Sequence, residues 1–99
     1  MQKLVETRIE IDEKVTAGEK LPETMILYAM DADHLVIAAK PVKALEENAL
    51  TKTSVKVVSQ QNKHVVMLPP KIYNFYHLDE NDYTIMASDK DPTTIIIAI

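Results

Sequence analysis

A run of polar side chains, Gln60-Gln61-Asn62-Lys63, could recognise the edges of DNA bases. Glutamine and asparagine can each form two hydrogen bonds with adenine, and lysine can reach guanine or a phosphate. Lys56 and His64 lie on the strands expected on either side, so the segment could enter a major groove as a β-ribbon does. Every hairpin also needs a polar turn, and this plainer interpretation stays open.

The segment around this turn carries positive charge without acid. No Asp or Glu occurs between Asn48 and Leu78, although the chain has 15 acidic residues and a formal net charge of −4. A window of this kind indicates a surface that meets an anionic partner. Lysines on strand faces can also serve only solvation and edge protection. The predicted DNA-binding set is Lys52, Lys56, Gln60, Gln61, Asn62, Lys63, His64 and Lys71.

Other chemistry has weaker candidates. Asp31, Asp33 and His34 are the nearest approach to a metal cluster, but aspartate in a tight turn usually accepts hydrogen bonds from its own backbone. No serine or threonine has a base partner at motif spacing, as a hydroxyl nucleophile requires. The chain has no cysteine and one glycine, which disfavours a thiolate site and a phosphate-binding glycine loop. We therefore expect no catalytic residue, no metal, no cofactor and no enzyme.

The C-terminal half must position the turn. Residues rich in β-branched side chains predict strands over Ser54–Ser59 and His64–Leu68, and prolines follow directly. Ile72, Phe75 and Tyr76 stand at i, i+3 and i+4, which predicts a short helix with one apolar stripe. Two more strands are expected, at Tyr83–Ala87 and Thr94–Ile99.

Residues 54–99 resemble the AbrB/MazE-like (SpoVT-AbrB) swapped-hairpin domain. The resemblance is carried by Val65-Val66-Met67-Leu68-Pro69, by Leu78-Asp79-Glu80-Asn81-Asp82 and by the closing Ile95-Ile96-Ile97. Asn81 stands where that family usually has glycine, so we expect a positive φ there. The turn lacks the glycine and arginines that many members of the family carry.

The N-terminal half, residues 1–42, is expected to form β-hairpins. Leu4–Ile11 alternates, with Ile9 and Ile11 inward, and strands follow at Met25–Met30 and His34–Ala39. This second hairpin aligns with residues 83–99, which suggests a degenerate half repeat of the same domain. Any two hairpins with Asp-rich turns also look alike, so this alternative stays open. Residues 43–53 are interpreted as a linker with one or two helical turns.

The predicted fold is mainly β, a swapped-hairpin AbrB-like barrel with one short helix. The strands at Tyr83–Ala87 and Thr94–Ile99 are apolar on both faces, and a small single sheet could not cover both. We therefore expect an interleaved homodimer. No run approaches the roughly 18 apolar residues of a membrane span, so we expect a cytoplasmic protein without a membrane partner.

The resemblance implies a transcriptional regulator that binds double-stranded DNA. One form of such a regulator is an antitoxin, in which case the acidic N-terminal half would meet the toxin protein. The alternative is a protein-interaction or assembly domain of the same fold without DNA binding. The feature that separates the two is whether the four lysines form one continuous face.

Overall fold

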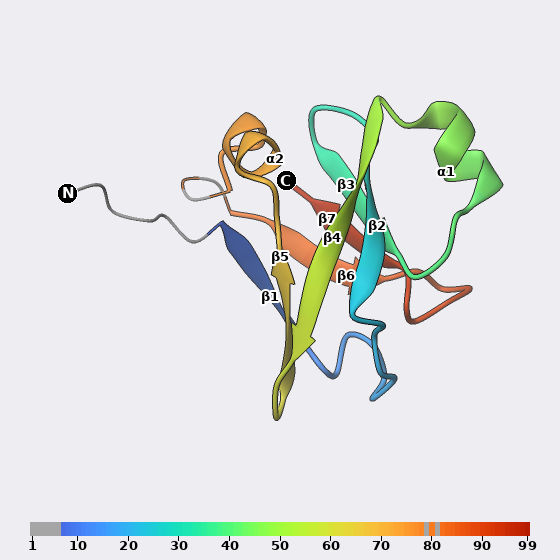
Figure 1. Ribbon diagram of the computed structural model, residues 1–99, viewed down its shortest axis with the longest axis vertical. Coiled ribbons are helices and arrows are strands. Elements are labelled where there is room, and N and C mark those ends of the chain that lie inside the picture. The colour runs from blue at the N-terminus through green and yellow to red at the C-terminus, as the bar shows by residue number, and fades with distance from the viewer. Residues whose placement is uncertain (1–6, 79, 81) are drawn as a thin grey trace.

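Seven antiparallel strands form one sheet that curves into a nearly closed barrel, in the part of the chain that the structure describes, residues 7–78, 80 and 82–99 (Figure 1). The coordinates are a computed structural model. The strand order along the sheet is β1-β5-β4-β2-β3-β7-β6. The elements in chain order are β1 Arg8–Asp12, β2 Thr24–Ala29, β3 His34–Ala38, α1 Lys43–Asn48, β4 Thr51–Ser59, β5 Lys63–Met67, α2 Pro70–Phe75, β6 Thr84–Ala87 and β7 Ile95–Ala98.

The predicted mainly β class is confirmed. The described residues contain two short helices, so the fold with one helix was wrong in number, although the helical turns expected in the linker form α1. Alternation determines the strand faces as expected. In β1, Ile9 and Ile11 point into the barrel while Glu10 and Asp12 are exposed. Because successive side chains of a strand point to opposite faces, this pattern shows that one face of β1 is buried and the other is exposed.

The barrel interior is filled by apolar side chains from every part of the chain. Leu27, Leu35, Ile37, Ile95 and Ile97 are all 0% exposed. Strands from both halves of the sequence contribute, because β4 pairs with β2 and β7 pairs with β3. One core therefore joins the N-terminal and C-terminal halves.

A second apolar cluster lies on the outer face of the sheet, beneath α1. Tyr28, Val36 and Ala38 are buried there, with Leu45 and Ile96 packed against them. Helix α1 lies over β2 and β3 on this side of the barrel (Figure 1). The backbone N–H of Val42 also donates to the Tyr28 hydroxyl at 3.3 Å.

This arrangement removes the reason given for a homodimer at β7 but not at β6, whose Met86 is 44% exposed. The expected problem was an apolar C-terminal strand that a lone chain would leave wet. In the structure Ile95 and Ile97 are fully buried in the barrel, and Ile96 packs into the cluster under α1. The premise was wrong for β7 because the helix in residues 43–53, expected only as part of a linker, covers the cluster that contains Ile96.

Helix α2 begins at the second residue of a proline pair and ends early. Pro70 occupies the first turn, where a missing N–H costs nothing, and Phe75 is the last helical residue. The chain then turns at His77, whose φ is 50°. Asn81, at which we predicted the positive φ, lies outside the described residues.

The side chains of α2 do not form the apolar stripe that their spacing predicted. Tyr76, just after the helix, is buried at 2% exposure, and its hydroxyl donates to the carbonyl of Asp31 at 2.6 Å. Ile72 packs partly against the core, but Phe75 is 60% exposed. The prediction was wrong for Phe75 because the helix is too short to bury all three positions.

β1 and β6 are the two edge strands of the sheet, and no pairing joins them among the described residues. Tyr83, just before β6, interacts electrostatically with Glu10 of β1. Burial raises the pKa of its phenol above the usual 10.0, and the charge of Glu10 on β1 adds to that effect after Tyr73.

Candidate functional site

The predicted base-reading turn is the tip of the β4–β5 hairpin. Gln60, Gln61 and Asn62 are exposed there, and the backbone N–H of Gln60 donates to the carbonyl of Lys63 at 2.8 Å. The tip is also attached to the segment after β1, because the N–H of Glu13 donates to the Asn62 carbonyl at 3.1 Å. The structure thus places the three polar residues together at one end of the barrel.

Acidic side chains stand beside this tip. Lys63 Nζ forms an ion pair with Glu10 Oε1 at 2.8 Å, and Lys63 lies directly opposite Asp12. The hydrogen bond from Lys63 holds the pKa of Glu10 below its usual value. The window that lacks acid in the sequence is therefore not free of acid in space, since β1 brings its carboxylates to β5.

His64 is turned into the protein rather than toward a ligand. Its side chain is 6% exposed, with the Ser59 hydroxyl 3.0 Å from Nδ1 and the Thr16 hydroxyl 3.3 Å from Nε2. The Thr16 Oγ1 also lies 3.0 Å from the carbonyls of Glu13 and Glu19, and because a carbonyl can only accept, we expect its single proton to go to one of them. Thr16 can then only accept from His64, which assigns the proton to Nε2 and leaves Nδ1 to accept from Ser59.

Sequence reasoning missed this Ser59–His64 pair. The two residues are directly opposite each other across the β4–β5 hairpin, and cross-strand pairing in so short a hairpin was the signal available. They line a hollow of about 740 Å³ together with Lys56 and Glu19. The group that faces Nε2 is the Thr16 hydroxyl rather than a carboxylate. The contacts of His64 with Thr16 and Ser59 therefore anchor the segment after β1 to the β4–β5 hairpin.

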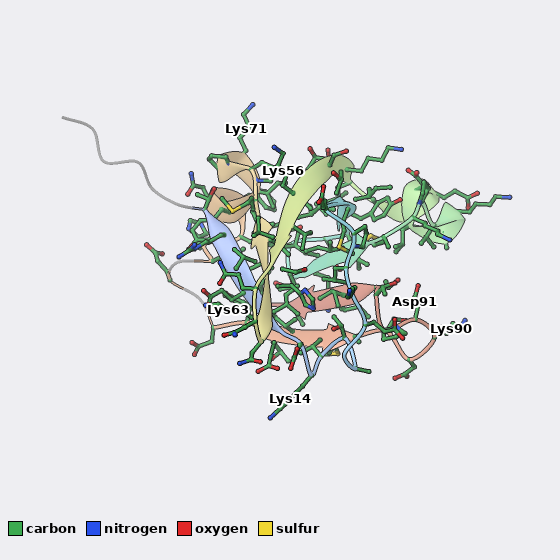
Figure 2. All side chains as sticks on the ribbon, turned by 60° about the horizontal axis from the view of Figure 1, so that its bottom comes forward. Lys14, Lys56, Lys63, Lys71, Lys90 and Asp91 are labelled. Carbon is green, nitrogen blue, oxygen red and sulfur yellow. The ribbon has the colours of Figure 1, made fainter. Side chains whose placement is uncertain are left out.

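The remaining lysines divide into two kinds. Lys52 Nζ is 2.6 Å from Glu46 Oε2, and this hydrogen bond raises the pKa of Lys52 above its usual value. Lys56 and Lys71 are exposed, and no carboxylate among the described residues forms an ion pair with either. Figure 2 shows Lys56 and Lys71 projecting to the same side of the molecule, with Lys63 and Lys14 elsewhere.

The four lysines therefore do not form one continuous positive face. Two of them already have a carboxylate partner, and apolar side chains interrupt the surface between the others. Met67 lies directly opposite Lys56 and is 39% exposed, and Val58, two residues along β4, is 51% exposed.

A groove between α2 and the start of β4 carries the most exposed large apolar side chains of the described chain. Leu50 is 70% exposed and Phe75 is 60% exposed, and both line this groove of about 540 Å³. Ala29, Ile72 and Tyr76 line it as well, and Lys52 and Lys71 are its charged residues. Sequence reasoning missed the groove because it assigned Phe75 to the core and gave Leu50 no role.

The turn interpretation of the acidic β2–β3 loop is confirmed. Asp31 Oδ1 accepts the backbone N–H of Asp33 at 2.8 Å and lies 2.9 Å from His34 Nδ1. These hydrogen bonds hold the pKa of Asp31 below its usual value, the backbone N–H of Asp33 contributing most. Within residues 7–78, 80 and 82–99, no group of three or more metal-ligating side chains is brought together.

Comparisons of the chain with protein-family models, with curated proteins and with solved structures each return no match. Of the helices in the described residues, neither has the length and apolar character needed to cross a bilayer.

Proposed function

We propose that this protein is a non-catalytic interaction module that docks a partner protein in the groove between α2 and β4. The observation that carries the proposal is the pairing of Leu50 and Phe75 on one groove, each more than half exposed. Single exposed apolar residues are common on protein surfaces, but apolar side chains gathered around a hollow mark interaction sites. Aromatic side chains in particular supply much of the binding energy at such sites.

The swapped-hairpin resemblance supports a specific architecture for this module. We propose that the β2–β3 and β6–β7 hairpins of one chain take the places that exchanged hairpins of two chains would take in an interleaved homodimer. The antiparallel pairing of β3 with β7 supports this, since it joins the two hairpins at their second strands. The module then acts as a monomer in the cytoplasm, and a toxin protein is one partner class that the resemblance implies.

The test is a random-peptide display selection on the intact protein, followed by fluorescence anisotropy with the enriched peptides. We expect Leu50→Glu and Phe75→Glu each to weaken binding at least about tenfold, because a buried unpaired carboxylate costs more than 1.4 kcal/mol. The matched control is Val58→Glu, which charges an exposed apolar position on the outer face of β4 and should bind as wild type.

Other outcomes separate the possibilities. If Val58→Glu loses binding and the groove variants do not, the docking surface is the outer face of β4 and β5. If no peptide is enriched, or if all three variants bind as wild type, the interaction-module proposal is wrong. Thermal unfolding of each variant checks that the fold is intact, and exposed substitutions should change stability by less than about 0.5 kcal/mol.

The second candidate is the transcriptional regulator that binds double-stranded DNA. It is supported by Lys56 and Lys71, which are exposed, lack an ion pair among the described residues and project to one side (Figure 2). In this case the two lysines would contact phosphates, and Gln60, Gln61 and Asn62 would contact bases.

The DNA test is fluorescence anisotropy at several salt concentrations with two duplexes. One has the sequence upstream of the protein's own gene, and the other has a random sequence. Lys56→Ala and Lys71→Ala should each reduce the salt slope by about one unit, whereas Lys14→Ala, at another side of the molecule, should leave it unchanged. Gln61→Ala should erode discrimination between sequences instead. Absence of binding at low salt, or equal slopes for all the lysine variants, would exclude this candidate.

A further inference from the structure

We propose that the groove binds an extended acidic segment of a partner protein, which adds as a strand to an open edge of β4. This inference rests on the proposed interaction module and specifies how that module recognises its partner. β-Strand addition of this kind uses the backbone of an exposed edge for affinity and adjacent pockets for specificity.

The open edge arises from a difference in strand length. β4 spans Thr51–Ser59, and β2 pairs with it from Thr51 to Lys56. On its other side β5 pairs with β4 only from Lys56 to Ser59, because β5 ends at Met67. The residue after β5, Leu68, donates its N–H to the carbonyl of Thr7, on the side of β5 away from β4.

No strand among residues 7–78, 80 and 82–99 therefore pairs with Thr51–Val55 on the α2 side. Alternation shows which backbone groups face that side. Gln60 bonds across the hairpin to Lys63, so the even-numbered residues of β4 direct N–H and C=O toward β5. By the same alternation, the N–H and C=O of Lys52 and Ser54 point to the open edge.

The groove runs along this edge. Thr51, Lys52 and Thr53 line one side, and Ile72 and Phe75 of α2 line the other. A strand added to β4 would lie about 4.8 Å from it and would point alternate side chains to the two faces of the sheet. One set would meet Ile72 and Tyr76 at the base of the groove, so that set should be apolar.

The charge around the groove determines which side chains are favoured on the other face of the added strand, away from Ile72 and Tyr76. Lys52 and Lys71 are the charged side chains that line the groove. The carboxylate of Glu46 occupies one side of Lys52, while Lys71 has no ion pair among the described residues. An incoming segment with acidic residues at alternate positions would therefore be attracted, and a basic segment would be repelled.

The probe is an acetylated and amidated nine-residue peptide of alternating valine and glutamate, titrated into the ¹⁵N-labelled full chain. We expect amide hydrogen exchange at Lys52 and Ser54 to slow at least about tenfold at saturation, because both N–H groups gain a partner. The amides of Lys56 and Val58, which already face β5, should not change. A valine–lysine peptide of equal length should bind at least about tenfold more weakly.

Two variants test the backbone role. Ser54→Pro removes an N–H that faces the open edge and no N–H of the β2–β4 ladder, so the protein should stay folded but lose the peptide. Two versions of the peptide are N-methylated, one at the odd-numbered residues and one at the even-numbered residues. Only the version whose methyl groups replace the N–H groups that face β4 should lose binding. Because the methylated peptide is used with wild-type protein, this second measurement holds even if Ser54→Pro unfolds.

The contrary results are distinct. Failure of the valine–glutamate peptide to bind at millimolar concentration, or binding without protection at Lys52 and Ser54, overturns strand addition. Protection that appears without peptide as protein concentration rises would show that a second copy occupies the edge. Protection by a duplex oligonucleotide would show a nucleic-acid ligand. If display-selected peptides still depend on Leu50 and Phe75 in any of these cases, the interaction module stands and only its proposed mode fails.

Discussion

Val36 of β3 lies directly opposite Ile96 of β7, and this pair is the centre of a symmetric arrangement. On either side of it, Leu35 faces Ile97 and Ile37 faces Ile95. The same positions correspond within the hairpins, since Ile37 is opposite Leu27 and Ile97 is opposite Ile85. The two hairpins thus share one register and meet about a local two-fold axis.

That register is what the tandem-repeat hypothesis requires. The alignment of residues 25–39 with residues 83–99 places Val36 on Ile96 and Leu35 on Ile95. A two-fold axis through the Val36–Ile96 pair exchanges these positions. A shared ancestry of the two halves remains a prediction, whereas their shared pairing geometry is observed.

The inward and outward faces of β7 should differ in their sensitivity to truncation. Ile97→Ala removes a side chain that is 0% exposed in the barrel, so we expect a loss of about 2–5 kcal/mol in unfolding free energy. Ile96→Ala should cost clearly less, because Ile96 is only half-buried under α1. Urea unfolding of both variants is the measurement, and equal losses would contradict the orientation of β7.

Tyr76 should tie α2 to the β2–β3 turn in a pH-dependent way. Tyr76→Phe removes the hydrogen bond to the Asp31 carbonyl and should cost about 1 kcal/mol near neutral pH. Burial, with smaller effects of Asp31 and Asp33, raises the pKa of Tyr76 above its usual 10.0. The folded state therefore favours the neutral phenol.

The sign of this effect follows from linkage. The contribution of a neutral Tyr76 is complete below pH 10 and is lost as the pH rises through the raised pKa of the folded state. Denaturant unfolding between pH 8 and 11 should show the wild type losing its advantage over Tyr76→Phe. A constant difference across that range would contradict the raised pKa.

The buried Thr16–His64 contact should determine the histidine tautomer. Long-range ¹⁵N spectra should show the proton of neutral His64 on Nε2, because Thr16 can only accept there. Thr16→Val removes the acceptor from a fully buried position and should cost about 1–3 kcal/mol. Thr16→Ser keeps the hydroxyl and is the matched control. An Nδ1–H tautomer in the wild type would contradict the assignment.

Two neighbouring residues after β1, Ala17 and Gly18, should change the stability of the protein in opposite directions when alanine is replaced by glycine and glycine by alanine. Ala17 has a φ of 55° and Gly18 a φ of 77°. Gly18→Ala meets no atom within 4 Å, so its cost is the left-handed backbone itself, about 1 kcal/mol. Ala17→Gly relieves the same strain and should be neutral or stabilising. Thermal unfolding distinguishes the signs, and a loss of stability with Ala17→Gly would contradict the backbone conformation.

The sequence by itself determined the local elements. The alternation of Ile9 and Ile11 with Glu10 and Asp12 depends only on neighbours in the chain, and the β4–β5 hairpin closes over a few residues. Helix formers at 43–50 likewise predicted turns where α1 forms. Such features follow from periodicity and turn chemistry, which act over short stretches.

The tertiary structure decided which surfaces remain free. Lys63 meets Glu10 from 53 residues away, so the charge of the predicted DNA-binding turn depended on the pairing of β1 with β5. β4 keeps an open edge because β5 ends five residues short of the start of the β2–β4 ladder, and Phe75 is exposed beside it. Burial and ion pairing depend on contacts between segments that no local pattern specifies, because the free energy of a long-range pair is set by the whole packing of the barrel.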